Sequence, residues 1–179
     1  MQYFNDCMVD LETTGTDPAY AHILQIAAVR FNLEEKTIDT SEMFDRCLMP
    51  IMARRFWDED TRAWWKGQKE GLLDSLIARS ELPEIVFRDF ASFLERTHCD
   101  RPLRIWAKPV SFEWPLIQSY ANQLRVNLPV RHTAGRDLYT YVEAKGHDWK
   151  EFSKTVEFKG DEHNALHDVL HQIELAMRA

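Results

Sequence analysis

Cysteine, long apolar runs and excess positive charge are all scarce in this sequence. Its three cysteines, Cys7, Cys47 and Cys99, are odd in number and far apart, so we expect reduced thiols rather than a disulfide framework or a C-x-x-C site. No apolar run approaches the roughly 18 residues that a membrane-spanning helix needs, and the first residues lack the charged and apolar regions of a secretory signal. These absences predict a cytoplasmic protein with no membrane partner.

The balance of charge excludes one way of binding nucleic acid. With 22 Lys and Arg against 29 Asp and Glu, the net charge is −7, which argues against tight, non-specific binding of duplexes by a basic surface. An acidic nuclease is not excluded, because bound cations would offset the acids of a metal site. The 179 residues suffice for one well-buried domain and are few for two, so we expect a single domain over residues 1–179.

Two acids near the N-terminus are the most informative feature of the sequence. Residues 4–12 are predicted to form a strand, on which alternate side chains share a face, so Asp10 and Glu12 project together. An acid-x-acid pair commonly marks only a solvated turn. This pair, however, ends an otherwise apolar strand, just before a turn that contains Gly15 and Pro18. Because hard cations such as Mg²⁺ and Mn²⁺ prefer carboxylate oxygens, the pattern indicates a metal site.

Beyond this strand, the apolar pattern predicts an α/β fold with a mixed central sheet. Residues 22–33 and 36–48 would complete an antiparallel three-stranded meander. The short apolar segment 103–107 lies between two helices and is expected to pair in parallel with the first strand. Helices are predicted from residues 58–61 to Gly67, over 69–79, 84–97 and 112–123, from the N-cap Asp137 to Ala144, and over 164–177, with a loop or short strand at 131–136.

Histidines and an acid gather at the start of the final helix. His163 lies just ahead of the helix and Asp168 lies one turn into it, so the two can serve a common site. His163, His167 and His171 also recur every four residues, which is the spacing of a zinc-binding pair on one helical face. A solvated stripe is the ordinary explanation for His167 and His171, and a mononuclear zinc hydrolase is the alternative that we rank last.

Three motifs, in this order along the chain, resemble those of the DEDDh 3′-5′ exonuclease superfamily, which includes RNase T, oligoribonuclease and polymerase proofreading subunits. The motifs are Asp10-x-Glu12, Phe112-Glu113-x-x-Leu116-Ile117 and His163-x-x-x-x-Asp168. More narrowly, the sequence resembles compact bacterial and phage 3′-5′ exoribonucleases at Trp64-Trp65 near Gln68 and at Arg136-Asp137-Leu138. The resemblance implies an RNase H-like fold, in which helices flank a mixed sheet made of an antiparallel meander and parallel strands.

The resemblance also implies an activity and a set of site residues. The enzyme would hydrolyse single-stranded RNA or DNA from the 3′ end and release nucleoside 5′-monophosphates. Two divalent cations, Mg²⁺ or Mn²⁺, would be held by Asp10, Glu12, Glu113 and Asp168, and such a pair can stabilise both the attacking and the leaving oxygen. His163 would be the general base, a role that suits an unperturbed pKa of about 6.5. Many members of the superfamily are dimers, so a homodimer is also implied.

Several residues are candidates for holding the substrate. Thr13 and Thr14 follow the acid pair directly and are expected to meet the terminal sugar. Trp65, or its neighbour Trp64, is expected to stack on a base, whereas Trp106 suits the core. Positive charge for a phosphate track would come from Arg54, Arg55, Arg62 and Lys66, or from Lys108, Arg131, His132 and Arg136.

One position departs from the family pattern. The family has aspartate after the phenylalanine of its second motif, whereas this sequence has Glu113, which reaches farther by about 1.5 Å. For a cation that demands near-octahedral geometry, this change could weaken the second metal or favour Mn²⁺ over Mg²⁺. The alternative function is therefore a catalytically weakened nucleic-acid-binding module that keeps the fold. The choice between RNA and DNA depends on a contact with the 2′-hydroxyl, which no motif reports.

Overall fold

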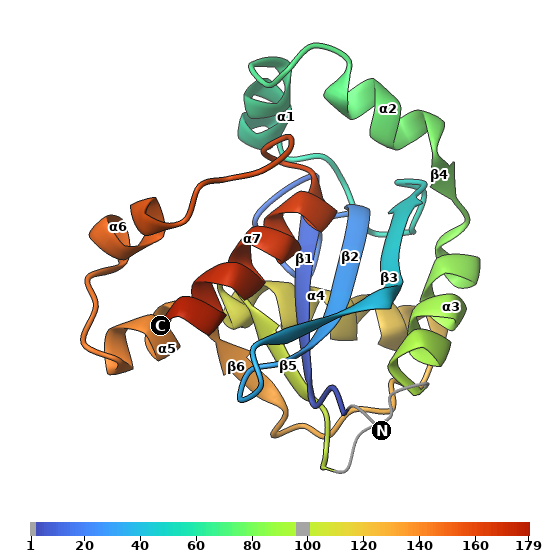
Figure 1. Ribbon diagram of the computed structural model, residues 1–179. Helices are drawn as coiled ribbons and strands as arrows, with labels where there is room; N and C mark the ends of the chain where they lie inside the picture. The colour runs from blue at the N-terminus through green and yellow to red at the C-terminus, as the bar shows by residue number, and fades with distance from the viewer. Residues whose placement is uncertain (1–2, 96–100) are drawn as a thin grey trace.

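A six-stranded mixed sheet forms the centre of the computed structural model, which describes residues 3–95 and 101–179 (Figure 1). The strand order is β4-β3-β2-β1-β5-β6. Strands β1 to β3 form an antiparallel meander, and β5 and β6 extend it in parallel with β1. The strands are β1 (Asp6–Thr13), β2 (Ile23–Asn32), β3 (Thr37–Leu48), β4 (Ser80–Glu81), β5 (Arg104–Ala107) and β6 (Gly135–Asp137). The predicted mixed sheet is confirmed.

Helices cover both faces of the sheet. The last helix, α7 (Ala165–Arg178), crosses one face against β1 and β2, while α3 (Pro83–Glu95) and α4 (Val110–Leu124) cover the other (Figure 1). The shorter helices are α1 (Glu59–Lys66), α2 (Leu72–Ala78), α5 (Leu138–Ala144) and α6 (Trp149–Phe152), the last followed by the 3₁₀ turn η1 (Ser153–Thr155). Within the described ranges, no helix combines the length and apolar character needed to cross a membrane.

Strand β1 is buried on both faces, and its alternation decides where the acids point. Cys7, Val9 and Leu11 pack in the core cluster that contains residues of α3 and α4, whereas Met8 packs in the cluster that contains residues of α7. Because alternate side chains of a strand share a face, Asp10 and Glu12 lie on the side of α7. The C-terminal end of β1 therefore places the carboxylates of Asp10 and Glu12 in the largely apolar layer between the sheet and α7.

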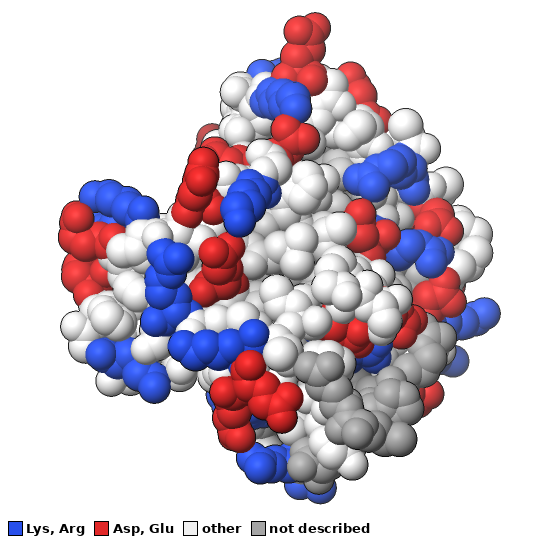
Figure 2. Space-filling view, in the orientation of Figure 1, with Lys and Arg blue, Asp and Glu red and all other residues white. Residues whose placement is uncertain are grey.

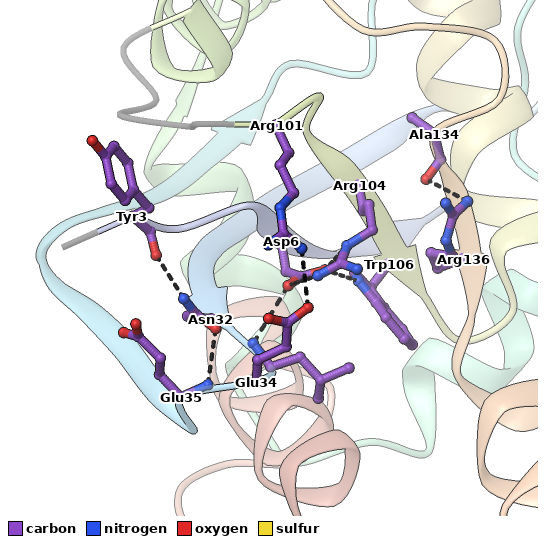
Figure 3. A network of polar contacts seen from close by, with 11 residues as sticks. Tyr3, Asp6, Asn32, Glu34, Glu35, Arg101, Arg104, Trp106, Ala134 and Arg136 are labelled. Carbon is purple, nitrogen blue, oxygen red and sulfur yellow. Dashed lines mark hydrogen bonds and ion pairs between the residues drawn. The ribbon is translucent and has the colours of Figure 1, made fainter.

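A buried network fixes the register between β1 and β5 at the other end of β1 (Figure 3). Asp6 has no solvent exposure. Its carboxylate accepts hydrogen bonds from Nε and Nη2 of Arg104, both at 2.6 Å, and from the indole Nε1 of Trp106 at 2.6 Å. The same register pairs Asp6 with Arg104 and Met8 with Trp106. A charge-assisted, two-pronged contact of this kind adds geometric specificity to the strand pairing.

Most predicted elements are present, and the predicted N-cap Asp137 is confirmed, whereas the cap of the first helix is Asp58, which was not singled out. Asp58 and Asp137 accept hydrogen bonds from the backbone N–H groups of Thr61 and Thr140 and so cap α1 and α5. The two-residue β4 and the four-residue α6 were not predicted. Cys7 and Cys47 are free, buried thiols. Cys99 and residues 96–97 of the helix predicted over 84–97 lie outside the described residues.

Candidate active site

Three carboxylates from β1 and α7 meet beside the end of β1. Oxygens of Asp10, Glu12 and Asp168 all lie within 4.8 Å of one another. Asp10 and Glu12 come from the strand, and Asp168 lies in the first turn of the helix that crosses it. Over residues 3–95 and 101–179, this is the one group of three or more His, Cys, Asp or Glu side chains with the proximity to hold a metal ion.

Glu113 approaches the same cluster from the first turn of α4. Its side chain is buried, and its Oε2 has no hydrogen-bond partner among the described residues. It is not one of the three acids that lie mutually within 4.8 Å, but it interacts electrostatically with all of them. A buried carboxylate oxygen without a donor is costly. A cation bound between Glu113 and the three acids would satisfy it, so the residues fit the oxygen-ligated metal centre that the sequence implied.

Burial and mutual repulsion raise the pKa of the clustered carboxyls. Burial, followed by the charge of Asp168, raises the pKa of Asp10 to about 7, against a lowering effect of Gln172 and Lys108. Burial is also the largest cause of the raised pKa values of Glu12, Glu113 and Asp168. Neighbouring carboxylates add to the rise for Glu12 and Glu113. Such a group of acids favours either bound protons or bound cations.

Two glutamines support the cluster. Nε2 of Gln172 donates to Oδ1 of Asp10 at 2.7 Å, and Oε1 of Gln25 accepts from the backbone N–H of Ala165 at 3.1 Å, at the start of α7. Neither residue was predicted from the sequence. The spacing of Gln172, four residues after Asp168 and hence on the same helical face, is the signal that would have found it.

His163 lies at the edge of the cluster. Its backbone has a φ of 61°, and its N–H donates to Oδ2 of Asp168 at 3.1 Å. Its ring packs edge-on against Trp64, with 4.6 Å between the centroids. The backbone of His163, the predicted base, is thus hydrogen-bonded directly to the carboxylate of Asp168, the last predicted ligand.

The other two histidines of the stripe serve different contacts. Nδ1 of His167 accepts a hydrogen bond from the N–H of Asp161 at 2.9 Å, and the ring of His171 lies 5.1 Å from that of Phe158. Within the described part of the chain, no potential metal-binding group contains His163, His167 or His171. The arrangement gives no support to the zinc hydrolase alternative.

A cavity of about 550 Å³ opens beside the acids. It is lined by Glu12, Thr13, Gly15, Thr16, Asp58, Asp60, Thr61 and Trp64. Trp64 is 42% exposed. The cavity thus joins one carboxylate of the cluster to an accessible indole ring.

Two of the predicted substrate contacts require correction. Thr14 is fully buried, and its hydroxyl donates to the carbonyl of Phe56 and accepts from the N–H of His22. Trp65 is only 4% exposed, and its indole N–H donates to the carbonyl of Thr13 at 2.9 Å. Since neighbouring residues on a helix point in different directions, Trp65 faces inward and supports the loop, while Trp64 faces the cavity.

Comparisons with known proteins agree with this fold. The sequence model of the 3′-5′ exoribonuclease Rv2179c-like domain matches residues 5–178. The nuclease domain of 3′hExo, described as a DEDDh family member and bound to rAMP, superposes with a TM-score of 0.71 at 14% identity, over 98% of this chain and 92% of that one. E. coli exonuclease I in complex with a dT13 oligonucleotide gives a TM-score of 0.68 at 16% identity, over 97% of this chain. This chain spans only 40% of that protein. No curated protein sequence matches the chain.

Proposed function

Because this chain belongs to the 3′-5′ exoribonuclease Rv2179c-like domain family, we propose that it removes nucleotides one at a time from the 3′ end of single-stranded nucleic acid. The products would be nucleoside 5′-monophosphates. RNA is the first substrate to test, since the family is described as exoribonucleases. DNA is the second, since a protein of similar fold is described in complex with dT13.

The observation that carries this proposal is the convergence of acids from three separate elements. Asp10 and Glu12 of β1 and Asp168 of α7 lie within 4.8 Å of one another, and Oε2 of Glu113 on α4 is buried without a partner among the described residues. These four residues would hold two divalent cations, Mg²⁺ or Mn²⁺, since all of their ligand atoms are oxygens. When bound, the cations would activate a water molecule and neutralise the charge that develops on the phosphate.

His163 would accept the proton of the attacking water at a ring nitrogen. Geometry supports this role, because the backbone of His163 is bonded to Asp168 and its ring is packed against Trp64. These two contacts hold His163 beside the acids and restrict the rotation of its ring, which a general base requires.

The cavity beside Glu12 would hold the 3′-terminal nucleoside. Its rim offers the exposed ring of Trp64 for stacking on a base and the partly exposed Thr13 next to the acids. Stacking on an aromatic ring is tolerant of base identity, so we expect weak sequence preference. The scissile phosphate would then lie over the carboxylates.

The experiment is digestion of 5′-labelled single-stranded RNA and DNA of equal sequence, with Mg²⁺ or Mn²⁺. A ladder that shortens from the 3′ end, lost in Asp10→Asn and kept in the matched surface variant Asp74→Asn, supports the proposal. Binding without digestion would instead support the alternative, a catalytically weakened nucleic-acid-binding module. Internal fragments without a 3′ ladder would contradict the exonuclease assignment.

A further inference from the structure

Lys108 lies beside the acid cluster without an acidic partner of its own. It directly follows β5, whose Trp106 pairs with Met8 of β1. In a parallel pair, counting two residues on from Met8 and Trp106 leads to Asp10 on β1 and to Lys108 just after β5. The positions of Asp10 and Lys108 are therefore neighbours in the same register. Within residues 3–95 and 101–179, no hydrogen bond or ion pair involves the half-buried ammonium of Lys108. A partly buried ammonium with unused donors is prepared to bind an anion.

The charge of Lys108 acts on only part of the cluster. Burial raises the pKa of Asp10, Glu113 and Asp168, and the ammonium of Lys108 opposes that rise in each. The charges that act on Glu12 are instead those of Asp10 and Asp168. Glu12 is the acid that lines the cavity proposed for the terminal nucleoside. Lys108 is not among the residues that line this cavity, and it follows β5, on the side of β1 that leads to β6 and α5.

A pair of packed aromatic side chains includes a neighbour of Lys108. Its Nζ lies 5.8 Å from the centre of the Trp149 ring, and Trp149 packs edge-on against Tyr139 with 4.4 Å between the centroids. Both aromatic residues are half-buried and belong to α6 and α5. In Figure 1, α5 and α6 lie well apart from α1, which carries Trp64. One indole ring, that of Trp149, thus lies beside Lys108, and another, that of Trp64, lines the cavity beside Glu12.

The lobe of α5 and α6 has no general excess of positive charge that would attract nucleic acid. Figure 2 shows Lys and Arg side chains on the lobe of α5 and α6, but acidic side chains are interspersed among them. Lys154 on this lobe, for example, is paired with Glu151 at 2.9 Å. A mixed surface of this kind exerts little long-range attraction on nucleic acid. The unpaired ammonium next to the acids is the feature that distinguishes Lys108.

We propose that Lys108 and Trp149 form a binding subsite for the nucleotide unit that precedes the terminal one. The ammonium of Lys108 binds the second phosphodiester from the 3′ end, and the indole of Trp149 stacks against the penultimate base. This proposal rests on the proposed function, which puts the terminal nucleoside in the cavity and the first phosphodiester over the acids. The strand then has to leave on the side away from the cavity, where an anion-binding group and a stacking surface stand together.

The test compares substrates that differ by one charged linkage. The dinucleotide NpN has only the scissile phosphodiester, and the trinucleotide NpNpN adds the second. Lys108→Met keeps most of the length of the side chain without its charge and should raise KM for NpNpN about tenfold, as expected for a hydrogen bond to a charged group. The loss on NpN should stay below about twofold, and Lys108→Arg should retain most of the affinity for NpNpN.

A neutral linkage provides the reciprocal change in the substrate. Replacing the second phosphodiester of NpNpN by a methylphosphonate should cost the wild-type protein the same factor and should cost Lys108→Met nothing further, because the two changes remove one interaction. Equal losses on NpN and NpNpN would overturn the proposal, since Lys108 would then act on the acids or the fold. Unchanged KM on both substrates would overturn it as well.

Failure of the proposed function can be told apart from failure of this subsite. If the wild-type protein cleaves neither substrate, the exonuclease proposal fails. The subsite is then judged by fluorescence anisotropy of a 5′-labelled trinucleotide, in its natural and methylphosphonate forms. Weaker binding by Lys108→Met to the natural form alone supports the subsite, and equal binding by wild type and variant overturns it.

Discussion

Gln172 of α7 donates from its amide Nε2 to Oδ1 of Asp10 on β1, at 2.7 Å, and both side chains are buried. Gln172 lies one helical turn after Asp168, so one face of α7 supplies a carboxylate to the cluster and orients another. Partners of this kind fix the direction of a ligand and influence the affinity of the site.

Gln172→Leu should weaken metal binding more than it weakens the fold. Losing the amide donor leaves Asp10 free to rotate, and we expect the Mg²⁺ concentration for half-maximal activity to rise by about tenfold or more. Activation curves and calorimetric titration measure this effect. Gln118→Leu, at an exposed position on α4, is the matched control. Unchanged metal affinity in Gln172→Leu would contradict the supporting role.

Without divalent cations, stability should fall as the pH rises. Burial, then the charge of Asp168, raises the pKa of Asp10 from 3.8 to about 7, so the folded state keeps a proton that the unfolded chain releases. The free energy of unfolding should therefore decrease between about pH 4 and pH 7, by an amount on the order of 4 kcal/mol for this group alone. Urea unfolding in EDTA at several pH values measures the slope.

The same pH series in saturating Mg²⁺ provides the control, because a bound cation stabilises the ionised carboxylates. The slope should shrink in Mg²⁺ and also in Asp10→Asn without metal. A slope that is the same in all three conditions would show that Asp10 does not titrate in this range.

His163→Asn should abolish most turnover while leaving the backbone in place. His163 has a φ of 61°, a conformation that asparagine tolerates better than most residues, so this substitution removes the imidazole with little added strain. We expect kcat to fall by roughly 10² to 10⁴ with little change in the affinity for single-stranded substrate. A fall in affinity with kcat retained would place His163 in binding rather than proton transfer.

Gly160→Ala should disturb the loop that leads to His163. Gly160 has a φ of 111°, and an added Cβ would lie 2.5 Å from Nδ1 of His167, the atom that accepts from Asp161. Gly146→Ala is the matched control, since Gly146 also has a positive φ but no atom within 4 Å of the added Cβ. Both variants should lose about 1 kcal/mol of stability from backbone strain. Only Gly160→Ala should also lose kcat.

Glu113→Asp should change the choice of metal. Aspartate, the residue of the family pattern, holds the carboxylate about 1.5 Å farther back, at the position that would suit the near-ideal octahedral geometry of Mg²⁺. The ratio of activity in Mn²⁺ to activity in Mg²⁺ should therefore fall in the variant. A ratio that stays constant would indicate that the longer side chain of Glu113 already reaches its position without distortion.

The parts of the fold that depend on local sequence were predictable. Strand β1 and helix α7 follow from apolar periodicity, and the cap Asp137 follows from the hydrogen bond that a short acidic side chain makes to the next turn. The resemblance could be found because its motifs are short and keep their order along the chain; the exoribonuclease family model confirms the family, and 3′hExo, described as a DEDDh family member, shares the fold. The implied homodimer stays a prediction.

Contacts between distant residues were not predictable. Gln172 and Asp10 are 162 positions apart, and Thr14 and Phe56 are 42 apart, so no local pattern connects them. Trp64 and Trp65 are adjacent on an eight-residue helix, where periodicity cannot decide which ring faces outward. The substrate contacts assigned to Thr14 and Trp65 were therefore the weakest part of the sequence analysis.

Strand β1 carries acids at both ends, and the acids at the two ends have different partners. At one end, Arg104 gives Asp6 a permanent counter-ion that is part of the chain. At the other, Asp10 has only the neutral amide of Gln172 as a direct partner among the described residues. Removing the cations with a chelator should therefore loosen the end of β1 that carries Asp10, while the end that carries Asp6 stays anchored. The part of the molecule's stability that can be lost and regained is then confined to the end where the counter-ion is exchangeable.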